Sequence, residues 1–164
     1  MTIDMDEAEA VFDDFLIAMD DQVEWLAEEA EKHNVELTYS PNTPELLETL
    51  FPLLSAGMDE DDTASLIVIF GRYLGEFVRR TYGGQWSLPL DDKKNVNFNT
   101  PVITGHSRVE GLEFAPIRVI RAYSLRRSDG TIRRAIENHI NPQILDLSQE
   151  AAEEANDESQ TPSN

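Results

Sequence analysis

The chain has 164 residues, no cysteine and a formal net charge of −19. This length favours one domain with a real hydrophobic core, and the lack of cysteine excludes disulfides, thiolate nucleophiles and cysteine-based zinc sites. The acidic N-terminus has neither the basic region nor the apolar run of a signal peptide, and no apolar stretch is long enough to cross a bilayer. We therefore expect a cytoplasmic protein without a membrane segment.

The charge is distributed unevenly along the chain. Residues 1–62 contain 19 acidic residues and one lysine, a net of −18, whereas residues 63–147 contain 12 basic and 8 acidic residues, a net of +4. Residues 148–164 add five acidic residues and no basic one. An acidic first third indicates a basic partner, although solubility or salt adaptation would give the same composition. The overall negative field disfavours nucleic acid.

Residues 4–33 have the periodicity of one long amphipathic helix, because apolar side chains recur at three- and four-residue steps from Phe12 to Ala30. Acidic residues continue to the C-terminal end of this helix, where the helix dipole does not favour them. We therefore expect them to serve recognition. The candidate partner-binding residues on this helix are Asp13, Asp14, Asp20, Asp21, Glu24 and Glu28.

A second helix is expected with Thr43 as its N-cap, Pro44 at its first helical position, and Pro52 kinking or ending it. Four acidic residues then precede a third helix. Their spacing does not fit an EF-hand loop, so we interpret them as a cap and first-turn charges and predict no metal site. These residues, Asp59, Glu60, Asp61 and Asp62, complete the partner-binding candidates.

The third helix, over residues 63–82, is apolar on all sides near its middle, which predicts a central buried helix. Gly71 and Gly75 lie on one face of it, so we expect another backbone to approach closely there, either within the chain or across a homodimer. The pair Gly83 and Gly84 is typical of a left-handed exit from a helix.

An aromatic and basic corner is expected at the end of this helix. Tyr73, Arg80 and Trp86 could line a small-molecule pocket, which is the alternative to a partner-binding surface. Glu76 stands four residues before Arg80, so the two are expected to form an ion pair on the helix surface.

Beyond Trp86 we expect two to four short antiparallel strands up to Phe114, including residues 95–99 and 101–105. Helices over about residues 116–127 and 132–139 follow. The sequence therefore predicts an α+β fold in which N-terminal helices pack on a small antiparallel sheet and further helices follow. One domain would cover residues 1–147, and the acidic tail, residues 148–164, is expected to be disordered.

No catalytic or cofactor motif is present. The histidines lack metal-ligand spacing, and there is no glycine-rich phosphate loop. The sequence therefore predicts neither an enzyme nor a cofactor. Arginines are frequent after residue 70, and they could pair with the acidic first helix, act across a dimer, or form a phosphate site if the last helices meet. They are Arg72, Arg79, Arg80, Arg108, Arg118, Arg121, Arg126, Arg127, Arg133 and Arg134.

The succession YLGEFVRR, GGQW, PVITG and FAPIRVIR, within residues 70–126, resembles small uncharacterised bacterial α+β proteins. Some of these are regarded as immunity proteins of polymorphic toxin systems. The resemblance implies a cytoplasmic protein without catalytic residues that binds a toxin domain. We therefore interpret the chain as a non-enzymatic, immunity-like inhibitor whose acidic surface covers a basic toxin or nuclease. The alternatives are a small enzyme or ligand-binding protein at the aromatic corner, and a structural homodimer.

Overall fold

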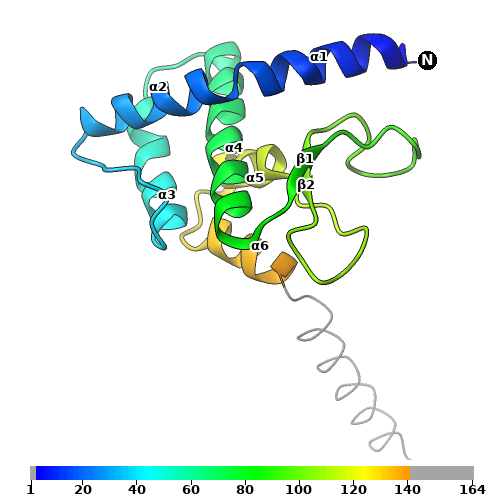
Figure 1. Ribbon diagram of the computed structural model, residues 1–164. Coiled ribbons are helices and arrows are strands. Elements are labelled where there is room, and N and C mark those ends of the chain that lie inside the picture. Colours follow the sequence, from blue (N-terminus) through cyan, green and yellow to red (C-terminus); the bar gives the residue numbers. More distant parts are fainter. Residues whose placement is uncertain (1–2, 141–164) are drawn as a thin grey trace, which may run out of the picture.

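A computed structural model describes residues 3–140 and shows a mainly helical protein with one small antiparallel sheet (Figure 1). The helices and strands are α1 (Met5–Ile17), α2 (Met19–Glu31), α3 (Thr43–Ser55), α4 (Glu60–Tyr82), β1 (Gln85–Ser87), β2 (Val102–Thr104), α5 (Pro116–Arg126) and α6 (Thr131–Ile140). The predicted domain end at residue 147 and the predicted tail, residues 148–164, lie outside the described residues.

The long helix α4 forms the centre of the fold, as its apolar sequence predicts. Residues 71–78 are all buried, and α2, α3 and α5 pack around this helix. Its 23 residues make it about 34 Å long. The helices therefore gather around α4 instead of forming the predicted layer on a sheet, and the α+β fold is dominated by helices.

The two glycines of α4 are covered within the chain. A Cβ atom on Gly71 would lie 2.8 Å from the Cα atom of Ile117 in α5, and one on Gly75 would lie 2.2 Å from the Trp86 ring. The predicted close approach of another backbone is therefore present, at Gly71. Because α5 and Trp86 occupy this face, it is not available for the helix contact that a homodimer would use.

The predicted first helix is present but is divided at Ala18 into α1 and α2. The helical hydrogen-bond pattern continues across the junction, since Ala18 N donates to the Asp14 carbonyl and Gln22 N donates to the Ala18 carbonyl, both at 3.1 Å. The two segments therefore form one bent helix. Figure 1 shows α1 running outward from the helical body toward the N-terminus.

The sheet is smaller than the sequence predicts. Strands β1 and β2 pair antiparallel with Trp86 opposite Ile103, and Ile103 also bridges to Phe114. The predicted strand over residues 95–99 is wrong, because this segment is a series of turns. Asn97 N donates to the Asn95 side chain at 2.9 Å, and such local bonds between side chain and backbone compete with strand pairing. Both asparagine side chains also donate to the distant Glu113 carboxylate, at 2.9 and 3.1 Å.

Helix α3 is present, but its N-cap is Asn42 and the predicted cap, Thr43, is its first helical residue. Pro52 does not end the helix, which continues to Ser55. Among the described residues, no helix is both long enough and apolar enough to span a membrane.

Candidate functional site

The ten predicted partner-binding carboxylates are all exposed. Five of them follow one another at helical spacing on the outer face of α1 and α2, opposite the buried residues Phe15, Met19 and Leu26. We call this surface the acidic ridge, and it consists of Asp13, Asp20, Asp21, Glu24 and Glu28. Asp14, the remaining predicted carboxylate of the bent helix, lies beside the acidic ridge.

Two apolar side chains stand within the acidic ridge. Ile17 is 80% exposed and lies four residues from both Asp13 and Asp21, so the three form one row along the helix. Trp25 continues this row by one further turn and is 39% exposed. Neither residue is predicted from the sequence, because the amphipathic pattern alone does not show which apolar side chains remain exposed.

The carboxylates of the acidic ridge are not neutralised by the arginines of the chain. Within residues 3–140, the ion pairs are Lys32–Glu29, Arg79–Glu76 and Arg133–Glu45. Arg72 does reach α1, but its guanidinium donates to the backbone carbonyl of Phe15 and lies 3.9 Å from the centre of that ring. The predicted pairing between arginines and the acidic first helix is therefore not formed in the described residues.

The cluster from Asp59 to Asp62 belongs to the start of α4 and not to the bent helix that carries the acidic ridge. Asp59 caps α4 and accepts a hydrogen bond from Asp62 N at 2.8 Å, as the capping interpretation predicts. About 15 Å of helix separates Asp62 from Arg72, where α4 contacts α1. Among the described residues, no three histidine, aspartate or glutamate side chains gather closely enough to hold a metal ion.

Tyr73 and Arg80 both contact Tyr39, from the connection between α2 and α3. The two tyrosine rings stack with centres 4.4 Å apart, and Tyr39 N donates to the Tyr73 hydroxyl at 3.1 Å. The Arg80 guanidinium lies 4.0 Å from the centre of the Tyr39 ring. Burial raises the pKa of Tyr73 to about 12. The hydroxyl therefore stays protonated at neutral pH.

Trp86, the third residue of the predicted pocket, has different neighbours. Its indole N–H donates to the Glu76 carboxylate at 2.9 Å, and its ring packs edge-on against Phe15. The predicted ion pair between Glu76 and Arg80 is wrong, because Glu76 pairs with Arg79 at 2.7 Å. Arg80 instead contacts an aromatic ring. Tyr73 and Arg80 therefore contact Tyr39, whereas Trp86 contacts Glu76 and Phe15, so the three residues do not line one common pocket.

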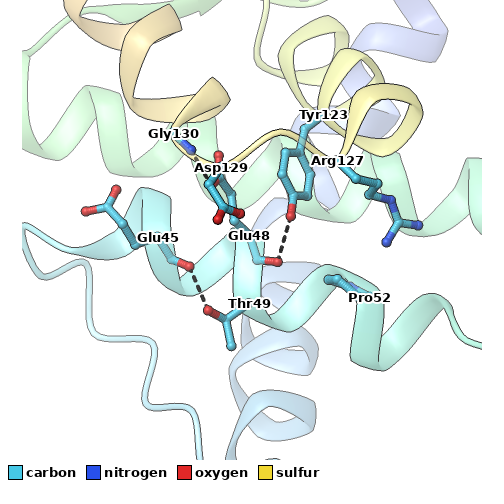
Figure 2. A pocket seen from close by; sticks show the side chains of 8 residues that line it. All are labelled: Glu45, Glu48, Thr49, Pro52, Tyr123, Arg127, Asp129 and Gly130. Atoms are coloured by element: carbon cyan, nitrogen blue, oxygen red, sulfur yellow. Dashed lines mark hydrogen bonds between the residues drawn. The ribbon is translucent and has the colours of Figure 1, made fainter.

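A hollow of about 550 Å³ lies between α3 and the connection from α5 to α6 (Figure 2). The carboxylate of Glu48, on its wall, accepts hydrogen bonds from Gly130 N at 2.8 Å and Ile132 N at 3.0 Å. The Tyr123 hydroxyl donates to the backbone carbonyl of Glu48. Because the Glu48 carboxylate already accepts two backbone donors, its evident role is to hold α6 against α3.

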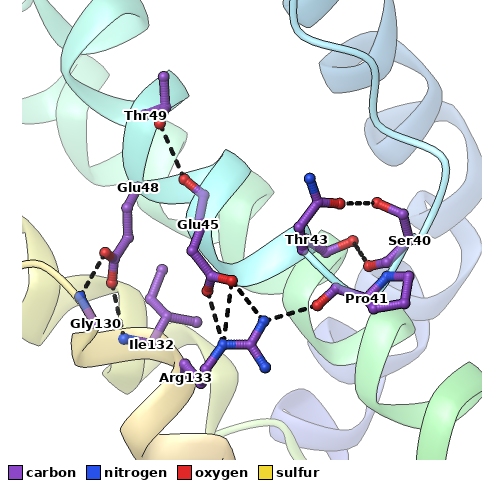
Figure 3. A network of polar contacts seen from close by, with 10 residues as sticks. Ser40, Pro41, Thr43, Glu45, Glu48, Thr49, Gly130, Ile132 and Arg133 are labelled. Carbon is purple, nitrogen blue, oxygen red and sulfur yellow. Dashed lines mark hydrogen bonds and ion pairs between the residues drawn. The ribbon is translucent and has the colours of Figure 1, made fainter.

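Beside it, Glu45 and Arg133 form a second link between α3 and α6 (Figure 3). Their closest atoms, Arg133 Nη2 and Glu45 Oε1, are 2.6 Å apart, and Arg133 also donates to the carbonyl of Pro41. Both side chains are largely exposed, so the pair contributes less to stability than the buried Glu48 contact.

The buried His106 and the half-buried His139 lie together at the end of α6. The rings of His106 and His139 are 6.3 Å apart, and Phe114 contacts both. Within the described part of the chain, both ring nitrogens of His106 and Nδ1 of His139 are buried without a hydrogen-bond partner. Burial lowers the pKa of each ring, and the proximity of His139 lowers that of His106 further. The two histidines are 33 positions apart in the sequence, so no spacing motif indicated that they form a pair.

No protein-family model, curated protein or solved structure matches this chain.

Proposed function

We propose that this protein is a non-catalytic protein-binding protein whose acidic ridge receives a basic partner. The observation that carries this proposal is the row of exposed carboxylates around the exposed side chains of Ile17 and Trp25, a row that forms no ion pair within residues 3–140. Protein interfaces commonly combine an apolar centre with a polar rim, and tryptophan is enriched among the residues that dominate binding energy. The acidic ridge has both components.

Electrostatics support a basic partner. The net charge of −18 on residues 1–62 creates a field that would accelerate the approach of a positively charged protein and would hold its orientation. Helix α1 runs outward from the body, so its outer face is accessible to a partner (Figure 1). A toxin or nuclease domain with a basic cleft has the required surface, and the protein would then act as its inhibitor.

The test compares the wild-type protein with two triple variants of equal net charge. The ridge variant carries Asp20→Asn, Asp21→Asn and Glu24→Gln. The control carries Asp91→Asn, Glu110→Gln and Glu137→Gln, which are exposed positions outside the ridge. Each protein is immobilised and exposed to lysate of its own organism at low and moderate salt. Proteins retained by the wild type are identified by mass spectrometry, purified and measured by interferometry.

The ridge variant should bind the basic partner at least about tenfold more weakly, mainly through slower association, whereas the control should resemble the wild type. Trp25→Ala should weaken binding at moderate salt, where long-range attraction is screened. Failure of the wild type to retain any basic protein at low salt, or equal binding by the ridge variant, would contradict the proposal.

A further inference from the structure

The last two helices, α5 and α6, pack side by side and leave a groove of about 490 Å³ between them. Three arginines line it, Arg118 and Arg126 from α5 and Arg134 from α6, and no carboxylate does. The groove is thus a positively charged surface on a chain of net charge −19.

The charges of these three arginines are not compensated within residues 3–140. Arg118 donates to the backbone carbonyl of Val96 at 2.9 Å, and Arg134 donates to that of Asp129 at 3.2 Å. Carbonyl oxygens orient a guanidinium without cancelling its charge, and each guanidinium has further donors to offer. The rim of the groove therefore presents positively charged donors, and hydrogen bonds orient those of Arg118 and Arg134.

Other arginines of α5 and α6 have different tasks. Arg133 pairs with Glu45, and Arg127 lies 5.0 Å from the centre of the Phe51 ring. All six cationic side chains in residues 116–140 are arginines, and only two acidic residues accompany them. Arginine binds phosphate with two parallel hydrogen bonds, which lysine cannot do, so this composition suits phosphate recognition.

The arrangement of the groove separates a charged end from an apolar floor. Arg134 turns back toward the connection between the helices, where Arg126 ends α5, so two guanidiniums belong to this end. Arg118 stands eight residues before Arg126, or about 12 Å along the helix. The floor between them includes the small apolar side chains of Ala122 and Ala135.

We propose that this groove binds a small phosphorylated molecule. Its phosphate groups contact Arg126 and Arg134, with the Ser128 hydroxyl as a further donor, and its apolar or flat body lies over Ala122 and Ala135. The ligand is small because the overall negative field repels a long polyanion, whereas two or three phosphate charges are outweighed by the nearby guanidiniums.

The probes for this site are pyrophosphate and ADP, measured by titration calorimetry at low salt. The groove variant is Arg126→Gln with Arg134→Gln, and its matched control is Arg108→Gln with Arg121→Gln, which are exposed and do not line the groove. Because all four positions are on the surface or half-buried rim, circular dichroism should show unchanged folding. The groove variant should bind both probes about tenfold more weakly, and the control should bind as the wild type does.

Three results would overturn the inference: no saturable binding of either probe, equal binding by the groove variant, or sulfate bound as tightly as pyrophosphate. The last would indicate attraction of any anion. The groove and the acidic ridge share no residue, so failure here would leave the proposed partner-binding function standing.

Discussion

At Gly71, the absence of a side chain lets α5 begin directly against the backbone of α4. Glycine inside a helix lowers its stability by about 1 kcal/mol relative to alanine. Here the contact with Ile117 compensates, because the two helices approach more closely than any side chain would permit. The sequence predicts this approach from the spacing of two glycines, but it does not identify the segment that approaches.

Replacing Gly71 by alanine should therefore destabilise the protein despite the better helix propensity. The new Cβ atom would meet the Cα of Ile117, which is backbone and can yield only if α5 shifts. We expect a loss of about 1–2 kcal/mol in the free energy of unfolding, measured with urea. Ser65→Ala, at an exposed position of the same helix, is the control and should change stability little. A Gly71→Ala protein more stable than the wild type would show that the contact is loose.

The two histidines at the end of α6 give the second prediction at the scale of single residues. Burial lowers the pKa of His106 and His139 below the ordinary value of 6.5, so the folded protein resists protonation that the unfolded chain accepts. As pH falls below 6.5, the unfolded state binds more protons and the free energy of unfolding decreases. Each histidine contributes a slope of up to about 1.4 kcal/mol per pH unit in the window between the two pKa values.

Urea denaturation between pH 7.5 and pH 5 should reveal this slope, and His106→Asn should reduce it. The control, His33→Asn, removes an exposed histidine just after α2 and should keep the wild-type slope. The comparison of slopes isolates the contribution of the substituted histidine from everything that the three proteins share. An unchanged slope in His106→Asn would contradict a lowered pKa of His106 in the folded state.

At the scale of elements, α6 depends on a residue from α3. Its first backbone N–H groups would be unsatisfied in an isolated helix, and the carboxylate of Glu48 accepts two of them, from Gly130 and Ile132. The negative charge also suits the positive end of the helix dipole. Glu48 therefore joins two helices whose sequences are more than 80 residues apart.

Glu48→Ala should lower the free energy of unfolding by about 2–4 kcal/mol, because it leaves two N–H groups without a partner in a buried site. The matched control is Glu45→Ala, one turn earlier on α3, which removes an exposed ion pair and should cost less than about 1 kcal/mol. Urea denaturation of both variants checks the difference. Equal effects would contradict the capping role of Glu48.

The elements that the sequence predicts well are those set by local chemistry. Gly83 has a positive φ and ends α4, and Pro116 lies in the first turn of α5, both as predicted. The prediction of a strand over residues 95–99 is wrong because asparagine alternates with apolar residues there, and this alternation resembles that of a strand. Their asparagines instead form turns, since Asn95 accepts from Asn97 N and both donate to Glu113.

At the scale of the whole molecule, contacts between residues far apart in the sequence determine which charged side chains pair with one another. Glu76 has three arginines within one turn, Arg72, Arg79 and Arg80. It pairs with Arg79, and the Trp86 indole N–H donates to the same carboxylate. Likewise, ten arginines were candidates for pairing with the acidic first helix. Those that have contacts within residues 3–140 meet carbonyl oxygens, aromatic rings or carboxylates outside this helix. The candidate ridge was therefore predictable as a set of acids, and its unpaired state was not.

The two tryptophans of the chain occupy opposite environments, with Trp25 exposed in the acidic ridge and Trp86 holding its indole N–H against Glu76 beside the core. Their fluorescence thus contains two separable optical signals. Quenching by a dissolved quencher reports on the ridge through Trp25, whereas a shift in emission wavelength on unfolding reports on the interior through Trp86. Tryptophan fluorescence can therefore distinguish binding of a partner at the acidic ridge from unfolding of the protein, without an added label.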